Sequence, residues 1–84
     1  MDYKILITLF VPEIEKSFEL YIPVNKTVLF VIKLLNSIVR ENMYDNYPIK
    51  EVIHLCNRRT GEFYKNDSYV RETDIRNGTQ LVMF

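Results

Sequence analysis

Apolar and polar residues alternate in two segments near the N-terminus, which is typical of strands buried on one face. In residues 3–10 the more apolar set is Tyr3, Ile5, Ile7 and Leu9, and the other face carries Lys4, Leu6, Thr8 and Phe10. Residues 18–22 alternate in the same way, after an interruption that contains Pro12. We expect the two segments to form an antiparallel hairpin, because little chain separates them. Its turn type is not defined by the sequence.

The apolar spacing changes from two to about 3.6 residues after Pro23, which predicts a helix. Thr27 is its expected N-cap, because a threonine hydroxyl can accept hydrogen bonds from the free amides of the first turn. The residues predicted to face a sheet are Val28, Val31, Ile32, Leu35, Val39 and Met43. Phe30 lies among the polar residues and Leu34 lies at a flank, so the helix has more apolar surface than one sheet face covers. We interpret Phe30 and Leu34 as a second candidate apolar surface, for a partner or another subunit.

The second half of the chain is more polar, and its predicted elements are shorter. Residues 42–48 mix Asn, Asp, Tyr and Pro, which indicates a loop. Residues 52–56 are expected to form a third strand, with Ile53 and Leu55 inward and His54 and Cys56 outward. We then expect a turn at residues 58–61 and a short strand at residues 62–64. A loop with room for one helical turn follows at residues 65–76, and the last strand is expected at residues 80–84. Asn77-Gly78 is the expected turn before the last strand, because both residues tolerate a positive φ.

This order predicts an α+β fold, with one helix across one face of a mixed four- to five-stranded sheet. The last strand is expected beside the first, in the middle of the sheet. A chain of 84 residues suffices for a single domain, residues 1–84, with one core. Cys56 is alone, and no signal sequence or apolar stretch of about 20 residues is present, so we expect a cytoplasmic protein without membrane insertion.

Two segments resemble the ubiquitin-like β-grasp family, and the resemblance extends over nearly the whole chain. The spacing of Thr27, Val28, Val31 and Leu35 is similar to the family's capped first helix. Residues 70–84 resemble its pattern of a core aliphatic residue, a polar turn, Ile, a Gly-containing turn and a closing Leu-x-aliphatic strand. The resemblance implies the ubiquitin-like fold and a protein-binding role for the sheet face opposite the helix.

Within this family the chain is most similar to the small YukD and EsaB proteins. The similarity lies in the opening strand Tyr3-Lys4-Ile5-Leu6-Ile7, in Phe18-Glu19-Leu20, and in an end that coincides with the last strand. It implies a cytoplasmic accessory of the type VII secretion system of Gram-positive bacteria. Ubiquitin and the sulfur carriers act through a C-terminal Gly-Gly, whereas Phe84 stands here, so we expect no activation of this terminus.

Candidate residues for catalysis or metal binding are few. His54 and Cys56 share one face of a strand, but no third orienting group accompanies them, and a metal site needs more than two ligands. The acidic residues pair within polar loops, as Glu13 with Glu15 and Glu72 with Asp74. A general acid and base need a water-shielded cleft that a domain of this size does not offer. We therefore expect no enzyme activity, no cofactor and no metal.

The overall charge favours no polyanionic partner. Eleven basic residues balance eleven acidic ones, so nucleic acid is an unlikely partner. Arg58 and Arg59, next to Thr60-Gly61, could hold a phosphate or an acidic peptide, but we interpret them as part of a solvated turn. A nucleic-acid-binding regulator stays as an alternative.

The strongest functional indication is the sheet face that points away from the helix. Its expected residues form our candidate protein-binding surface: Leu6, Thr8, His54, Cys56, Val82 and Phe84. Exposed apolar patches with polar borders are usually protein-docking sites. The leading hypothesis is a non-catalytic interaction module that assists or regulates type VII secretion, with a membrane component of the machinery as partner. A sulfur carrier or modifier is the disfavoured alternative, and self-association is left open.

Overall fold

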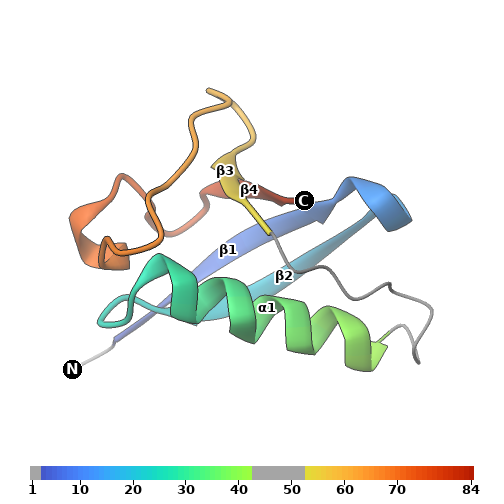
Figure 1. Ribbon diagram of the computed structural model, residues 1–84, viewed down its shortest axis with the longest axis horizontal. Coiled ribbons are helices and arrows are strands. Elements are labelled where there is room, and N and C mark those ends of the chain that lie inside the picture. The colour runs from blue at the N-terminus through green and yellow to red at the C-terminus, as the bar shows by residue number, and fades with distance from the viewer. Residues whose placement is uncertain (1–2, 43–52) are drawn as a thin grey trace.

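The computed structural model describes residues 3–42 and 53–84, and this part of the chain forms one mixed sheet with one α-helix on it (Figure 1). The elements are β1 (Lys4–Val11), η1 (Pro12–Ile14), β2 (Lys16–Pro23), α1 (Val28–Asn42), β3 (Leu55–Asn57), η2 (Val70–Glu72) and β4 (Gln80–Met83). The two η elements are single turns of 3-10 helix. The predicted α+β class and element order are confirmed.

The four strands lie in the order β2-β1-β4-β3. β1 pairs antiparallel with β2 and parallel with β4, and β3 pairs antiparallel with β4. In the parallel pair, Leu9 lies opposite Leu81. The last strand therefore lies beside the first in the middle of the sheet, as the sequence predicts.

The connection between β1 and β2 is a single 3-10 turn that closes without glycine. Glu15 takes the left-handed conformation there, with φ 53°, and its N–H donates to the carbonyl of Pro12 at 3.1 Å. It is the one residue other than glycine with a positive φ among residues 3–42 and 53–84. This explains why the sequence gives no recognisable turn signature.

The start of α1 is held by a loop that is distant in sequence as well as by its own cap. The Phe30 N–H donates to the Thr27 hydroxyl at 3.2 Å, which confirms the predicted N-cap. The N–H groups of Val28 and Leu29 donate to the carbonyls of Ser68 and Asn66, at 2.8 and 3.0 Å. Because the first amides of a helix lack partners inside it, this loop satisfies two of them.

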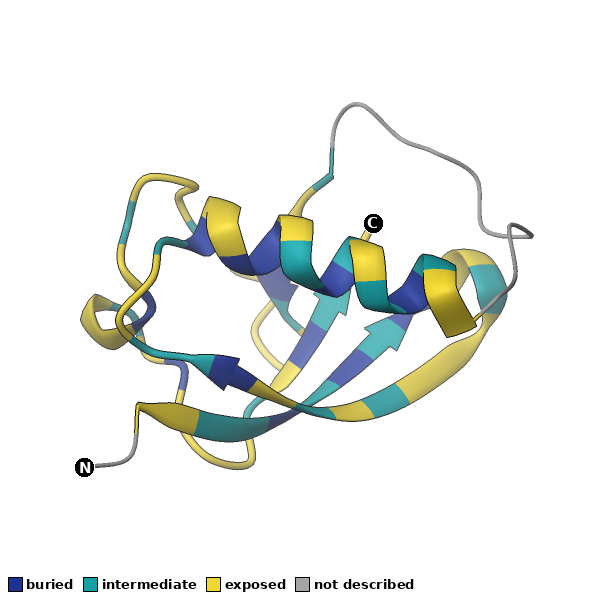
Figure 2. Cartoon of the chain, turned by 90° about the horizontal axis from the view of Figure 1, so that it is seen from below, coloured by how far each residue is buried: buried dark blue, intermediate teal, exposed yellow. Residues whose placement is uncertain are grey.

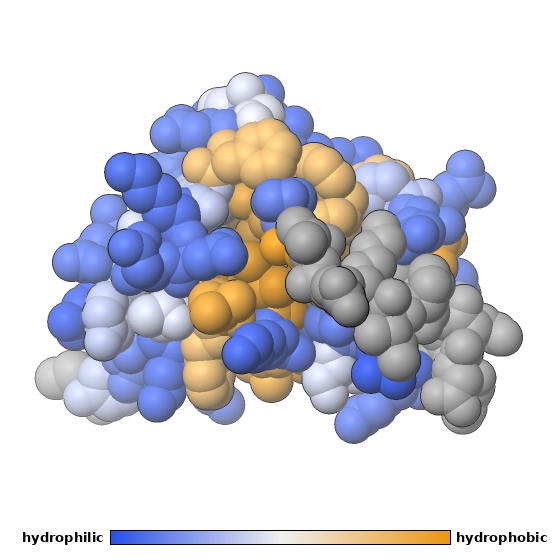
Figure 3. Space-filling model, viewed as in Figure 1, coloured by the Kyte–Doolittle hydropathy of each residue, from blue (hydrophilic) through white to orange (hydrophobic). Residues whose placement is uncertain are grey.

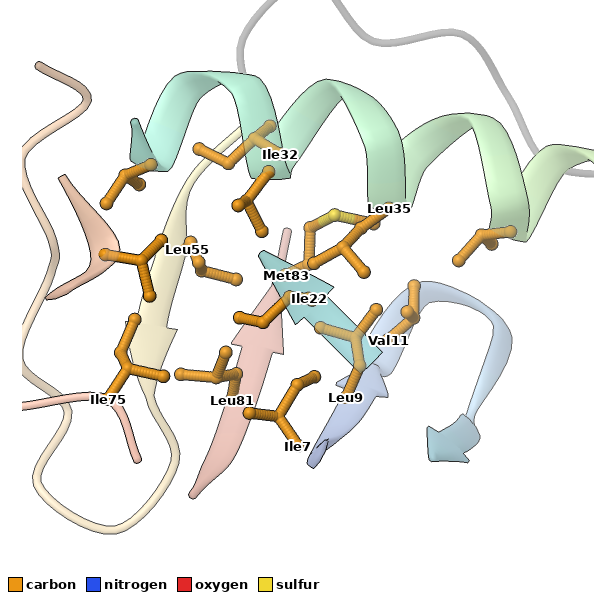
Figure 4. Packing of buried hydrophobic residues seen from close by; sticks show 14 residues of the cluster. Ile7, Leu9, Val11, Ile22, Ile32, Leu35, Leu55, Ile75, Leu81 and Met83 are labelled. Carbon is orange, nitrogen blue, oxygen red and sulfur yellow. The ribbon is translucent and has the colours of Figure 1, made fainter. Parts of the chain in front are cut away.

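The core lies between α1 and the inner face of the sheet (Figure 4). The predicted helix stripe is buried at every described position, and in Figure 2 the buried segments of α1 face the strands. Sheet residues buried against it include Ile7, Leu9, Ile22, Leu81 and Met83. Val70 and Ile75 from the polar segment before β4 close one side of the core.

Several details differ from the sequence prediction, and the last strand ends at Met83 instead of residue 84. Tyr3 is exposed, because it precedes β1 and lies beyond the edge of the core. The third strand is Leu55–Asn57 instead of residues 52–56. The short strand predicted at residues 62–64 is reduced to an isolated bridge between Phe63 and Cys56. Met43, Val52 and residues 43–48 of the predicted loop lie outside the described residues.

No helix within residues 3–42 and 53–84 has the length and hydrophobicity to cross a membrane.

The two leucines at positions 6 and 9 of β1 provide a matched test of which sheet face forms the core. Leu9 is completely buried, whereas Leu6 faces away from α1 and is half-buried. We expect Leu9→Ala to lower the free energy of unfolding by about 2–5 kcal/mol, because it leaves a cavity in the core. Leu6→Ala should cost less than half as much. Urea denaturation of both variants gives the comparison, and equal losses would contradict this assignment of the faces.

Candidate functional site

The sheet face opposite α1, here called the outer face, carries the side chains that alternate with the core residues. On β1 these are Leu6, Thr8 and Phe10, and Phe10 lies opposite Val82 of β4. Val82 in turn lies opposite Cys56 of β3. Side chains directly opposite on neighbouring strands share a face, so Phe10, Val82 and Cys56 form one row across the sheet.

Three aromatic rings gather at the β3 end of the outer face. The ring centroids of His54 and Phe63 are 5.5 Å apart, those of Phe63 and Phe84 are 5.6 Å apart, and those of His54 and Phe84 are 6.2 Å apart. Two of the three contacts are edge-to-face, an arrangement that aromatic rings prefer. We call His54, Phe63 and Phe84 the aromatic cluster.

The aromatic cluster remains open to solvent although its rings touch. Phe63 is 54% exposed and Phe84 is 40% exposed, and His54 is also exposed. The backbone fixes two of the rings, because His54 and Phe84 exchange both N–H to carbonyl hydrogen bonds, at 2.6 and 3.0 Å. Figure 3 shows hydrophobic surface in a band from the region of β3 and the chain end toward α1, bordered by hydrophilic residues.

Cys56 was predicted to be part of the exposed protein-binding surface, but the structure buries it. It faces outward as predicted but is only 6% exposed, and it is a free thiol. Its neighbours across the backbone are Val82 on one side and Phe63, in the isolated bridge, on the other, and we expect Phe63 to provide most of the cover. Burial raises the pKa of the Cys56 thiol, so this cysteine holds its proton more firmly than an exposed one.

Arg58 reaches across the outer face to Phe10. Its backbone N–H donates to the carbonyl of Gln80 at 2.9 Å, so Arg58 starts beside β4 on the β3 side. Its guanidinium carbon lies 4.5 Å from the centroid of the Phe10 ring, on β1. Because β4 lies between β1 and β3, the Arg58 side chain crosses over β4.

The predicted protein-binding surface is divided into two parts. Val82 and Phe84 lie at the aromatic end, whereas Leu6 lies at the other end, where its N–H donates to Asn77 Oδ1 at 2.8 Å. Polar Thr8 and Gln80 are paired between the two ends. The Leu6 carbonyl accepts from the N–H of Gly78, six residues before Phe84, so Leu6 and Phe84 are about 20 Å apart along the strand direction.

Arg59 occupies a different place from Arg58. It lines a polar cleft of about 430 Å³ together with Asn57, Thr60, Asp74, Asn77, Gly78, Thr79 and Gln80. Asn57 Oδ1 accepts hydrogen bonds from the N–H groups of Arg59 and Thr60, at 2.9 and 3.1 Å. The two arginines therefore lie in different places: Arg58 is on the outer face, and Arg59 lines the polar cleft together with Asp74.

Tyr64 connects this cleft to the body of the domain. Its hydroxyl donates to Asp74 Oδ1 at 2.6 Å and accepts from Asn57 Nδ2 at 3.1 Å. Burial, with the hydrogen bond to Asp74 as a second cause, raises the pKa of Tyr64 to about 12. The network joins the β3 turn to the segment before β4.

The other acidic residues considered for catalysis lie in a helix cap or in an exposed turn. Glu72 Oε1 accepts from the Tyr69 N–H at 3.1 Å, which caps η2. Glu13 and Glu15 lie exposed in the turn between β1 and β2. No group of three or more His, Cys, Asp or Glu residues that could hold a metal ion occurs in the described part of the chain.

The second candidate surface, on α1, is more open at Phe30 than at Leu34. Phe30 is exposed and Leu34 is half-buried. Leu29, which is also exposed, adjoins Phe30 in sequence. The Lys26 Nζ lies 5.2 Å from the centroid of the Phe30 ring, so a cation already occupies part of this surface.

No protein-family model and no curated protein sequence matches this chain. Its structure is similar to a chain of the MycP5-free ESX-5 inner membrane complex, with a TM-score of 0.81 and 13% identity over 99% of this chain. This chain spans only 21% of that one. The EccD5 ubiquitin-like domain from Mycobacterium xenopi gives a TM-score of 0.81 and 11% identity, with coverage of 99% and 94%. Caldiarchaeum subterraneum ubiquitin gives a TM-score of 0.72 and 15% identity, with coverage of 95% and 90%.

These likenesses establish the fold. The chain has the ubiquitin-like β-grasp fold, as the sequence resemblance predicts, with four strands and one helix across the inner face of the sheet.

The Tyr64 network predicts a loss of stability at alkaline pH. The pKa of Tyr64 is raised in the folded state, so its stabilising contribution is complete below the unfolded value of about 10 and is lost as the pH rises toward about 12. Between about pH 9 and about pH 11, wild type should lose more unfolding free energy than Tyr64→Phe. Urea denaturation at both pH values measures this, with Tyr21→Phe as the control for removing a phenolic hydroxyl. Equal losses in wild type and Tyr64→Phe would contradict the prediction.

The burial of Cys56 beside Phe63 predicts slow thiol chemistry. We expect the native thiol to react with a disulfide reagent at least about tenfold more slowly than the unfolded chain at about pH 8, because the group is buried and protonated. In Phe63→Ser the logarithm of the reaction rate should rise by at least about half of the difference between the native and the unfolded chain. Phe30→Ser, on the helix, should leave the rate at the native value. A Phe63→Ser rate equal to that of wild type would show that another group shields Cys56.

Proposed function

We propose that this chain is a non-catalytic protein-interaction module that assists or regulates a bacterial type VII secretion system from the cytoplasmic side. Its partner is a membrane component of that machinery, and the aromatic end of the outer face is the docking surface. The observation that carries the proposal is the exposed aromatic cluster of His54, Phe63 and Phe84.

The aromatic cluster has the properties of a docking site. Phe63 and Phe84 expose large parts of their rings, and aromatic residues are enriched among those that contribute most to binding at protein interfaces. The three residues are held by backbone pairing next to β3 and β4 and their rings touch one another, so little side-chain freedom is lost when a partner covers them. The thiol next to the cluster, Cys56, is buried and not open to solvent.

The likeness to the EccD5 ubiquitin-like domain and to a chain of the ESX-5 inner membrane complex supports the choice of pathway. Both cover 99% of this chain with a TM-score of 0.81. In the second of these, a region of this shape is part of a larger membrane-complex chain. A domain of the same shape is suited to binding proteins of such a complex. This step rests on likeness of fold, and fold alone does not determine function.

Site-specific photo-crosslinking in the source bacterium tests the proposal. A photoreactive phenylalanine analogue at position 63 is tolerated by the fold because Phe63 is 54% exposed. We expect irradiation to join the chain to an inner-membrane component of the secretion machinery, in the membrane fraction, since the ring lies at the docking surface. Mass spectrometry of the crosslinked product identifies the component.

Tyr21 provides the control, because it is 63% exposed on the outer face but lies opposite Leu6, away from the aromatic cluster. The same analogue at position 21 should give at least about fivefold less product. Equal products at both positions, or products confined to proteins unrelated to secretion, would contradict the proposal.

A further inference from the structure

The central position of Arg58 on the outer face indicates what kind of partner the face accepts; this inference rests on the proposed docking function. The Arg58 guanidinium lies 4.5 Å from the Phe10 ring, and the side chain passes over β4 to reach it. Phe10, Val82, Cys56 and Phe63 follow one another across the sheet. A fixed positive charge therefore lies next to the aromatic cluster, on the same surface.

The stacked guanidinium is prepared to bind an anion. A guanidinium that lies over an aromatic ring keeps its N–H donors at its edge, where a carboxylate can accept two of them in parallel. Arg58 is exposed, so these donors are accessible to a partner. Stacking on Phe10 also restricts the side chain before binding, which reduces the entropy lost when a salt bridge forms.

We propose that the outer face binds a protein segment that combines a carboxylate with a bulky apolar side chain. The carboxylate pairs with Arg58, and the apolar side chain lies on the aromatic cluster. Val82 lies on β4 and Phe84 directly follows the end of that strand, two residues later, so the two subsites are separated by about 7–10 Å. Asp or Glu two positions from Leu, Ile, Phe or Met in an extended segment spans this distance, and a spacing of three or four does so in a helix.

The surrounding charges favour a carboxylate partner over nucleic acid. Binding of a nucleic-acid backbone needs several cations, each neutralising a phosphate. The outer face also carries Lys4, at the opposite end of β1 from Phe10, and Glu19, which lies opposite Thr8. One guanidinium beside the aromatic cluster suits one carboxylate next to an apolar contact better than a row of phosphates.

Selection from a random dodecapeptide display library tests the inference without knowledge of the natural partner. The full chain is the bait, and Phe63→Ser with Phe84→Ser in the same chain is the counter-selection bait. We expect the enriched peptides to contain Asp or Glu within four positions of a bulky apolar residue. The median affinity of synthetic copies should fall about tenfold for Arg58→Gln, as expected for loss of a charge-assisted hydrogen bond.

Arg71→Gln is the matched control, because Arg71 also stacks on an aromatic ring, with its guanidinium carbon 5.4 Å from the centroid of Tyr69. Arg71 belongs to η2, outside the sheet. Its replacement should leave the affinity of the selected peptides within about twofold. A loss equal to that of Arg58→Gln would show that general positive charge, and not the position of Arg58, determines binding.

The outcomes separate this inference from the proposed function. Enrichment of apolar peptides without acidic residues, bound equally by wild type and Arg58→Gln, would overturn the inference and leave the aromatic docking surface intact. Peptides that bind the Phe63→Ser, Phe84→Ser chain as well as wild type would overturn both. Arg58-dependent binding of a 12-nucleotide RNA at about 0.15 M salt, in place of acidic peptides, would assign the face to nucleic acid. Concentration-dependent dimerisation lost on Phe84→Ser would assign it to a second copy.

Discussion

The parallel pairing of β1 with β4 is the contact on which the rest of the structure depends. It places Leu9 opposite Leu81 at the centre of the sheet, and β2 and β3 add to its two sides. It joins residues 8–10 to residues 80–82, and pairing between residues so far apart in sequence is slow because a long loop must close first. The same pairing determines the outer face, because a strand that buries Leu81 and Met83 must direct Val82 and Phe84 the other way. The same strand register thus determines both the core and the candidate docking surface.

Most of the fold follows from local patterns in the sequence, and the exceptions have a common cause. Alternation predicts β1 and β2, a 3.6-residue period with Thr27 predicts α1, and Asn77-Gly78 predicts the start of β4. Each of these signals is contained in a few neighbouring residues. The hydrogen bonds from Val28 and Leu29 to the carbonyls of Ser68 and Asn66 have no such signal, because carbonyl groups are present in every residue. The position of the loop becomes visible only in three dimensions.

The candidate site was less predictable than the fold, for reasons that particular residues show. Alternation correctly placed His54, Cys56, Val82 and Phe84 on one face, but it carries no information on what covers them. Phe63 lies next to Cys56 through a bridge from a segment that forms no regular strand, and Cys56 is buried. Phe10 was assigned to the outward set by its spacing, yet its contact with Arg58 depends on strand order and on one long side chain crossing β4. The separation of Leu6 from Phe84 also needs the register, which relates positions on different strands.

Folding accounts for only part of the surface of the aromatic cluster. Phe63 lies beside buried Cys56, and a smaller apolar side chain would provide much of any cover that it gives. What remains unexplained by folding is the exposed part of Phe63 and Phe84, together with a guanidinium held over Phe10. Exposed aromatic area in contact with water is unfavourable for an isolated domain, and a stacked arginine adds little to stability at a surface. Both become favourable once a partner excludes water from them, because burial then adds hydrophobic free energy and strengthens the charge interaction. The arrangement is therefore better explained by a bound state of the domain than by its folded state alone.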